Sequence, residues 1–305
     1  MIPFKDITLA DKDIITAFTM KSNRRNCDLS FSNLCSWRFL YDTQFAVIDN
    51  FLVFKFWAKE KLAYMMPVGE GDIKVILHDL ITDAEREQQD FCMLGVCSKM
   101  REELEDILPD QFTFTENRDY ADYIYLRSDL ASLKGKKYQA KRNHINRFRN
   151  TYPDYEYTPI TPDRIQECID LEAEWCKLNN CDQQDGTGNE RRSLTYALNN
   201  FEALGLTGGI LHVNGKIAAF TFGMPINHET FGVHVEKANT TIDGAYAMIN
   251  NEFANHIPEQ YKYINREEDL GIPGLRKAKL SYQPTIILEK YMACFKDHPI
   301  DKIKW

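Results

Sequence analysis

The feature that most restricts the fold is a run of apolar segments and turn signals between residues 208 and 284. Three β-rich runs come first, and Asn214-Gly215 separates the first two. Because Asn-Gly between such runs is the strongest short hairpin signal, we expect an antiparallel meander. Residues 243–256 then carry apolar side chains at helical spacing. A short strand at 262–265, a two-turn helix that begins near Pro273 and a last strand complete the predicted order.

This order is that of the second half of an acyltransferase fold of the GNAT type. Residues 44–126 predict a similar order of three strands, helix, strand, helix and strand. No repeat is visible residue by residue, so two copies of one fold is an inference from topology alone. We therefore expect an α+β protein with mixed sheets, built as a tandem duplicated GNAT-like acyltransferase fold. The predicted domains are 1–135 and 136–305, the second opened by a basic helix.

Four segments resemble a known family. Arg266-Glu-Glu-Asp-Leu-Gly and Gly274-Leu-Arg-Lys-Ala-Lys-Leu-Ser-Tyr-Gln-Pro resemble the closing motif of soluble proteins related to the C-terminal catalytic domain of phosphatidylglycerol lysyltransferases. The Ser-Phe-x-Asn-Leu-x-x-Trp pattern at 30–37 and the Lys-x-x-x-Lys-Arg-Asn pattern at 137–143 also recur in that family. It is related to the Fem-type peptidyltransferases, whose donor is aminoacyl-tRNA. The resemblance covers nearly the whole chain and implies aminoacyl or acyl transfer to an amine or hydroxyl.

Composition excludes several classes of protein. A net charge of −8 argues against a protein that coats nucleic acid over its whole surface. No apolar run approaches the roughly 20 residues of a membrane span, and the N-terminus is not a signal peptide. The eight cysteines are scattered without a Cys-x-x-Cys pair. We therefore expect a cytoplasmic protein with reduced thiols and no metal site.

Residues 131–150 contain no acidic side chain, although the protein as a whole is acidic. A helix is predicted from Lys136. Lys134, Lys137, Lys141 and His144 fall at steps of three or four, hence on one side. One interpretation is a helix that contacts phosphates of an RNA acceptor end or an acyl-carrier ligand. The other is a solvated helix between domains. The candidate donor-binding residues here are Lys137, Lys141 and Arg142.

Acyl transfer to an amine needs an aligned donor and acceptor, a base for the amine proton and hydrogen-bond donors for the developing oxyanion. Glu236 ends the predicted strand 231–235, where related enzymes open a cleft between two splayed strands. A carboxylate flanked by apolar residues there could have a raised pKa and act as the base. The alternative is an exposed turn at Glu236-Lys237.

Coenzyme A users of this fold carry a glycine-rich loop, Arg/Gln-x-x-Gly-x-Gly/Ala, before the next helix. Gly244 retains the glycine, whereas Thr241 and Tyr246 replace the other motif residues. The helix N-terminus still offers amides to an anion, so Gly244 and Tyr246 are candidate donor-binding residues. The departures make a coenzyme A thioester the weaker choice of donor beside aminoacyl-tRNA.

The segment 265–284 places four cations beside three acids. Arg266, Arg276 and Lys279 are candidates for gripping donor phosphates. Asp269 could bind the amino group or orient Arg276, and Tyr282 could donate a proton to the leaving hydroxyl. The alternatives are simple charge neutralisation and a packed aromatic ring. The catalytic candidates are therefore Glu236, Asp269 and Tyr282, meeting the Arg266–Arg276 loop at one cleft lined by Tyr246.

Together these patterns predict an aminoacyl or acyl transferase. The tRNA acceptor end is the candidate donor partner, and a small molecule, a peptide or a lipid head group is the candidate acceptor. A coenzyme A-dependent N-acetyltransferase is one alternative. A non-catalytic binding protein on the same fold is the other, and the sequence leaves the acceptor and the oligomeric state open.

Overall fold

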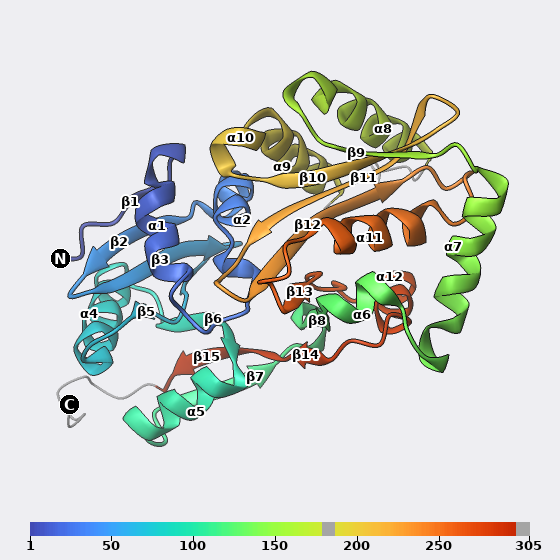
Figure 1. Ribbon diagram of the computed structural model, residues 1–305. Coiled ribbons are helices and arrows are strands. Elements are labelled where there is room, and N and C mark those ends of the chain that lie inside the picture. The colour runs from blue at the N-terminus through green and yellow to red at the C-terminus, as the bar shows by residue number, and fades with distance from the viewer. Residues whose placement is uncertain (179–186, 297–305) are drawn as a thin grey trace. The chain divides into compact units, whose positions relative to one another are not determined.

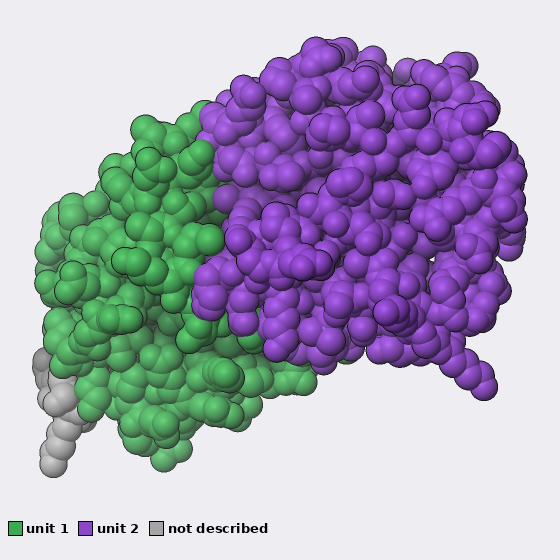
Figure 2. All heavy atoms as spheres, in the orientation of Figure 1, with its two compact units in different colours: residues 1–122, 268–271, 287–305 green, residues 123–267, 272–286 purple. Residues whose placement is uncertain are grey.

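The computed structural model describes residues 1–178 and 187–296, which form two compact units (Figures 1 and 2). The first unit contains residues 1–122, 268–271 and the described chain from 287 onward. The second contains 123–267 and 272–286. This division differs from the predicted domains 1–135 and 136–305. The second unit begins earlier, and a late strand is part of the first unit's sheet.

The first unit is built on a mixed sheet with the strand order β1-β2-β3-β4-β6-β15-β7, and β5 pairs with β3. All of its neighbouring strands are antiparallel except β4 and β6, which are parallel and pair through Tyr64 and Met93. Its strands are β1 (Lys5–Asp6), β2 (Gln44–Ile48), β3 (Phe51–Ala58), β4 (Lys61–Tyr64), β5 (Val68–Gly69), β6 (Cys92–Cys97), β7 (Phe112–Glu116) and β15 (Lys290–Phe295). Its helices are α1 (Lys12–Thr19), α2 (Phe31–Ser36), α3 (Arg38–Tyr41), α4 (Ile73–Arg86) and α5 (Ser98–Ile107).

The last strand of the first unit comes from the far end of the chain. Residues 285–291 predict one strand, whereas the structure has two short ones, β14 (Ile286–Leu288) and β15. β15 lies between β6 and β7 and pairs with both. Cys294 faces Cys92 across the β6–β15 ladder, and the two form a disulfide. The expectation that all cysteines are reduced is therefore wrong for this pair.

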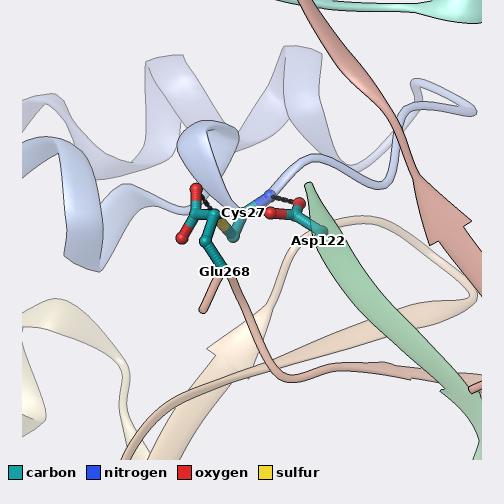
Figure 3. Close-up of side chains that lie close together, drawn as sticks. All are labelled: Cys27, Asp122 and Glu268. Atoms are coloured by element: carbon teal, nitrogen blue, oxygen red, sulfur yellow. Dashed lines mark hydrogen bonds between the residues drawn. The ribbon is translucent and has the colours of Figure 1, made fainter. Parts of the chain in front are cut away.

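A buried charge cluster joins four parts of the first unit, and Figure 3 shows three of its side chains, Cys27, Asp122 and Glu268. The Lys290 ammonium, only 4% exposed, lies 2.7 Å from Asp28, 2.8 Å from Asp122 and 2.7 Å from Glu268. The backbone N–H of Cys27 donates to Asp122 over 2.9 Å, and the Cys27 thiol donates to Asp122 and Glu268. The cluster ties the segment before α2 to Asp122, to the segment 268–271 and to β15.

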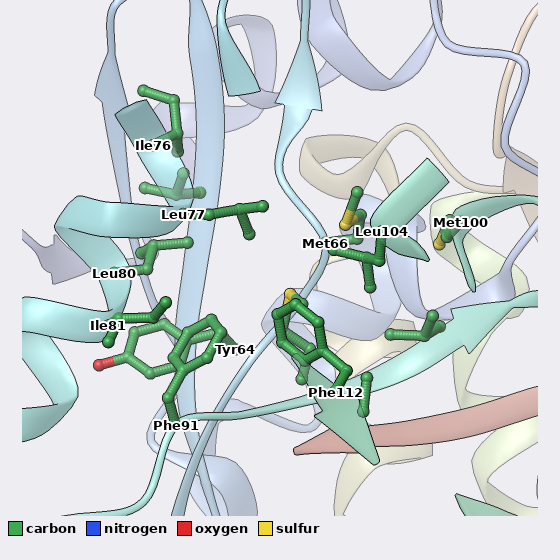
Figure 4. Close-up of a cluster of buried hydrophobic side chains, with 14 of the residues drawn as sticks. Tyr64, Met66, Ile76, Leu77, Leu80, Ile81, Phe91, Met100, Leu104 and Phe112 are labelled. Atoms are coloured by element: carbon green, nitrogen blue, oxygen red, sulfur yellow. The ribbon is translucent and has the colours of Figure 1, made fainter. Parts of the chain in front are cut away.

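The apolar core of the first unit explains why α4 forms (Figure 4). Asp72 caps the helix by accepting a hydrogen bond from the Lys74 backbone N–H at 3.0 Å. The inward stripe of α4 repeats at helical spacing and packs on aromatic rings from the sheet. This stripe consists of Ile76, Leu77, Leu80 and Ile81, and the rings include Tyr64, Phe91 and Phe112.

The second unit holds the meander that the sequence predicts. Its sheet has the order β14-β8-β13-β12-β11-β10-β9, and α8 and α11 lie on either side of it (Figure 1). Its strands are β8 (Asp122–Leu126), β9 (Glu156–Pro159), β10 (Thr207–Val213), β11 (Lys216–Pro225), β12 (Thr230–Ala238), β13 (Tyr263–Asn265) and β14. Its helices are α6 (Arg127–Ser132), α7 (Gln139–Thr151), α8 (Ile165–Leu178), α9 (Thr187–Asn199), α10 (Phe201–Leu204), α11 (Ala245–His256) and α12 (Pro273–Leu280).

The turn between β10 and β11 confirms the predicted hairpin. Asn214 and Gly215 have φ of 52° and 72°, and Val213 pairs with Lys216. Positive φ at both central residues is what a type I′ turn requires. β12 then leads through α11 to β13, which is parallel to β12. The expected α+β class with mixed sheets and GNAT-like element order is confirmed. None of the helices that the structure describes is long and apolar enough to cross a membrane.

Candidate active site

The candidate site lies where two parallel strands of the second unit stop pairing. β12 and β13 pair through Thr230–Gly232 and Tyr263–Asn265. Beyond that point, side chains of β12 contact side chains of the residues that follow β13. His234 Nδ1 lies 2.8 Å from Glu267 Oε1, and Arg266 donates to Glu236 Oε1 over 2.8 Å. The strand ends are thus joined by two side-chain contacts where the backbone ladder has ended.

Glu236 lies within β12, which continues to Ala238, so the exposed-turn alternative is wrong. Its side chain is 12% exposed. Oε1 accepts from Arg266, and Oε2 accepts from the Asn250 amide of α11 over 3.0 Å. Its side chain therefore contacts a guanidinium and an amide, which the apolar residues that flank it in the sequence do not reveal. The next residue, Lys237, is buried and pairs with Glu190 over 2.9 Å.

Arg266 is the centre of the cluster. Its guanidinium carbon lies 4.8 Å from the ring centroid of Tyr282 and 5.7 Å from that of Tyr125. Burial opposes its charge, but Glu236 and the two tyrosines outweigh burial and raise the pKa of Arg266. For Tyr282, in contrast, burial raises the pKa because the charged form of a phenol is the deprotonated one. This phenol therefore holds its proton firmly. The predicted meeting of Glu236, Arg266 and Tyr282 is present in the structure.

Lys141 reaches the same cluster from α7. Its Nζ lies 3.8 Å from the ring centroid of Tyr282. Burial and the nearby Arg266 lower the pKa of Lys141 to about 8, against a smaller opposing effect of Glu236. Two cations and one carboxylate therefore surround one aromatic ring. Such a group can bind an anion or stabilise a developing oxyanion.

The other predicted residues of the 265–284 segment have structural contacts. Lys279 is buried, and its Nζ donates to the carbonyl of Arg266 over 2.5 Å. That contact holds the loop after β13. Arg276 is half-buried on α12. Asp269 belongs to the first unit, where it accepts from the Gly271 backbone over 2.9 Å and lies 3.5 Å from Arg118.

The basic helix is partly neutralised within its own unit. Lys137 pairs with Asp129 over 3.1 Å. Arg142 donates to the carbonyls of Leu133 and Gly135 and so fixes the loop before α7. Lys134, Lys136 and His144 are exposed, whereas Lys141 faces Tyr282. The predicted basic face therefore divides into one inward lysine and an outer set of cations.

The N-terminus of α11 is covered by α7. Gly244 has φ of 84°, and a Cβ there would lie 3.0 Å from the carbonyl oxygen of His144. Tyr246 accepts a hydrogen bond from the Trp175 indole over 3.1 Å. Coenzyme A users place pyrophosphate at the corresponding helix end. A carbonyl oxygen there carries partial negative charge, which disfavours an anion.

Several residues of the site escape prediction from the sequence. His234 and Asn250 lie in no motif, and Glu267 lies in the Arg266–Gly271 motif without being chosen as a candidate. The one available signal is the period of two along β12, which puts His234 and Glu236 on the same face. Tyr125 comes from β8, far away in the sequence, so only the folded sheet brings it beside Arg266.

One group of side chains that could ligate a metal ion lies in the described part of the first unit. One ligand atom each from Cys27, Asp122 and Glu268 lies within 4.8 Å of the others. The Lys290 ammonium already contacts both of these carboxylates. The lysine therefore supplies the positive charge that a metal ion would bring, and the set serves as a structural cluster.

Comparisons with known proteins show the family and the fold of this chain. The family model described as "Phosphatidylglycerol lysyltransferase, C-terminal" matches residues 19–294. An uncharacterized protein of Mycoplasmoides gallisepticum is 23% identical over 172 residues, which are 56% of this chain and 54% of that protein. The match thus spans about half the length of that curated relative.

Three solved structures are similar to this chain. A conserved protein of unknown function from Bacteroides thetaiotaomicron is 85% identical, with TM-score 0.96, over 97% of this chain and all of that one. The C-terminal domain of a putative lysylphosphatidylglycerol synthetase from Agrobacterium fabrum is 13% identical, with TM-score 0.69. L-PGS from Bacillus licheniformis is 16% identical, with TM-score 0.64. The last two matches each cover 95% of this chain and 93% of the other, and they show a shared fold.

Proposed function

This chain belongs to the family of phosphatidylglycerol lysyltransferase C-terminal domains, and on that premise we propose that it transfers an aminoacyl group from aminoacyl-tRNA to an amine or hydroxyl. One observation carries the proposal. The Arg266–Glu236 pair, Lys141 and Tyr282 gather where β12 and β13 separate. The Arg266 guanidinium in this group suits a reaction that develops negative charge on an ester carbonyl oxygen.

In this mechanism Arg266 stabilises the developing oxyanion. Glu236 holds the guanidinium with one carboxylate oxygen and is itself held by Asn250 through the other. Both contacts fix the direction of Arg266 before the reaction, so little reorganisation is needed in the transition state. Tyr282 presents its ring face to both cations and keeps its hydroxyl protonated.

The choice of tRNA over coenzyme A rests on the start of α11. The loop 241–246 departs from the pyrophosphate-binding pattern. The backbone of His144 also lies against Gly244, at the helix end where the pyrophosphate would bind. Exposed cations before α7, Lys134 and Lys136, suit the sugar-phosphate backbone of an acceptor stem. A small molecule, a peptide or a lipid head group remains the proposed acceptor.

The test measures loss of ester-linked label from tRNA charged with radioactive amino acids, in the presence of lipid, peptide and small-amine fractions. We expect protein-dependent transfer into one fraction. Arg266→Met should lower kcat by about 100- to 1,000-fold, because it removes one donor to the oxyanion. Arg266→Lys keeps the charge but loses the planar fork, so it should restore only part of the rate. Lys216→Met, an exposed lysine of the β10–β11 hairpin, is the matched control.

A parallel assay with acetyl-coenzyme A separates the alternatives. If free coenzyme A thiol is released and no ester-linked label is lost from charged tRNA, the donor is acetyl-coenzyme A and the proposed tRNA donor is wrong. Inactivity with both donors across all three acceptor fractions would favour a binding protein that has kept the fold.

A further inference from the structure

Lys141 differs from the other cations of the second unit in its surroundings. Its Nζ lies over the ring of Tyr282, a residue that is 6% exposed. Both oxygens of Glu236 are engaged, by Arg266 and by Asn250. Among the described residues Lys141 forms no salt bridge. The amine therefore has an aromatic face and a second cation as neighbours, without a carboxylate contact of its own.

The charged groups around Lys141 come from several elements. Arg266 follows β13 and opposes a second positive charge, whereas Glu236 of β12 favours it. Tyr282 follows α12, and Tyr125 of β8 lies beside both Arg266 and Tyr282. On α7 itself Arg142 is held by backbone carbonyls, and His144 is exposed.

This arrangement favours an amine that can exist without its proton near neutral pH. Burial removes water that would solvate the ammonium, and Arg266 adds like-charge repulsion. A neutral lysine is a competent base, because its conjugate acid then has a pKa near the working pH. Glu236 is less suited to that task because each of its oxygens already accepts a hydrogen bond.

We propose that Lys141 is the proton acceptor of the transfer reaction, an inference that rests on the function proposed above. The neutral acceptor nitrogen attacks the ester carbonyl carbon, and its N–H proton passes to Nζ of Lys141. The carbonyl carbon then expels the ribose oxygen, which takes a proton from the Lys141 ammonium. One C–N bond forms and one C–O bond breaks. Amine and ester become amide and alcohol, without an oxidant or reductant.

The first test reads the amine directly and does not depend on the reaction. Lysines are reductively methylated with ¹³C-formaldehyde, and the Lys141 methyl resonance, assigned with Lys141→Arg, is followed against pH. We expect a midpoint near pH 8, more than two pH units below the ordinary lysine value of about 10.4. Glu236→Gln should lower the Lys141 midpoint, and Arg266→Met should raise it. A midpoint at the ordinary lysine value overturns the role of Lys141.

The second test reads the transfer. Lys141→Arg keeps a cation over Tyr282 but cannot accept a proton at working pH. We expect kcat to fall about 100- to 10,000-fold with donor KM nearly unchanged, and the rise of wild-type kcat through pH 8 to disappear. If Lys141→Arg has the same kcat and the same pH profile as the wild type, Lys141 is not the proton acceptor, and the transferase proposal still stands. Absence of transfer by the wild type overturns both, even where the titration midpoint lies near 8.

Discussion

The substitution Lys290→Met would test what the buried cluster of the first unit contributes to stability. Methionine keeps most of the side-chain length and volume and removes only the charge. Three carboxylates, from Asp28, Asp122 and Glu268, then lose the cation that lies within 2.8 Å of each. Removing one partner from a buried ion pair typically costs about 3–5 kcal/mol, because the remaining charge stays desolvated. For a unit of this size that corresponds to a fall in Tm of roughly 6–20 °C.

The pH dependence of that loss follows from the pKa shifts. Burial lowers the pKa of Lys290, but Asp122, Asp28 and Glu268 outweigh it and raise the pKa well above the usual range. The stability that Lys290 contributes is therefore fully present at every pH below the ordinary pKa of lysine, including neutral pH. It is lost only in strong alkali. Burial raises the pKa of Asp122 to about 7. Asp122 therefore contributes stability that is present at acid pH and falls as pH rises from about 4 to about 7.

Thermal unfolding of Lys290→Met and wild type at pH 5 and pH 8 checks both points. We expect the loss at pH 8 to exceed the loss at pH 5, since protonated carboxylates no longer repel one another. Lys61→Met, at an exposed position of the same sheet, is the control and should change Tm little. A loss below about 1 kcal/mol at pH 8, or one independent of pH, would refute the reasoning.

Three further predictions concern the backbone, the disulfide and the outer cations. Gly244→Ala should destabilise by about 1–2 kcal/mol in thermal unfolding because of its φ of 84°, whereas Gly274→Ala, with open space around it, should not. Non-reducing peptide mapping should recover a linked Cys92–Cys294 peptide. Reduction should cost up to about 5 kcal/mol, given a sequence separation of 202, and recovery of unlinked peptides alone counts against the bond. Lys134→Glu with Lys136→Glu should weaken tRNA binding and flatten its salt dependence, and an unchanged slope of log K against log salt excludes these lysines from the contact.

Local patterns predict much of the second unit correctly. Asn214-Gly215 requires positive φ at both residues, and few strand registers satisfy such a turn, so the β10–β11 hairpin follows from a dipeptide. The helix at 243–256 follows from spacing in the same way. Both features depend on residues close together in sequence, where the chain has few alternatives.

Long-range pairing lies beyond such patterns. The six residues of β15 could pair with several strand edges, and only the completed sheet selects β6 and β7. The Cys92–Cys294 disulfide depends on that choice, which is why cysteine spacing alone predicts free thiols. The inward direction of Lys141 depends on how α7 packs, because a helical repeat of lysines indicates a shared side and does not say which neighbour it faces.

The position of β15 also affects the order in which the chain can fold during synthesis. Until residues 290–295 leave the ribosome, the facing edges of β6 and β7 have no strand between them. At about 5–20 residues per second, the roughly 170 residues from β8 to β15 take on the order of 10–30 seconds to make. Over that interval the first unit presents two unpaired strand edges, which are templates for pairing with other chains. A nascent chain arrested before residue 290 should therefore hold chaperones longer than the finished protein does.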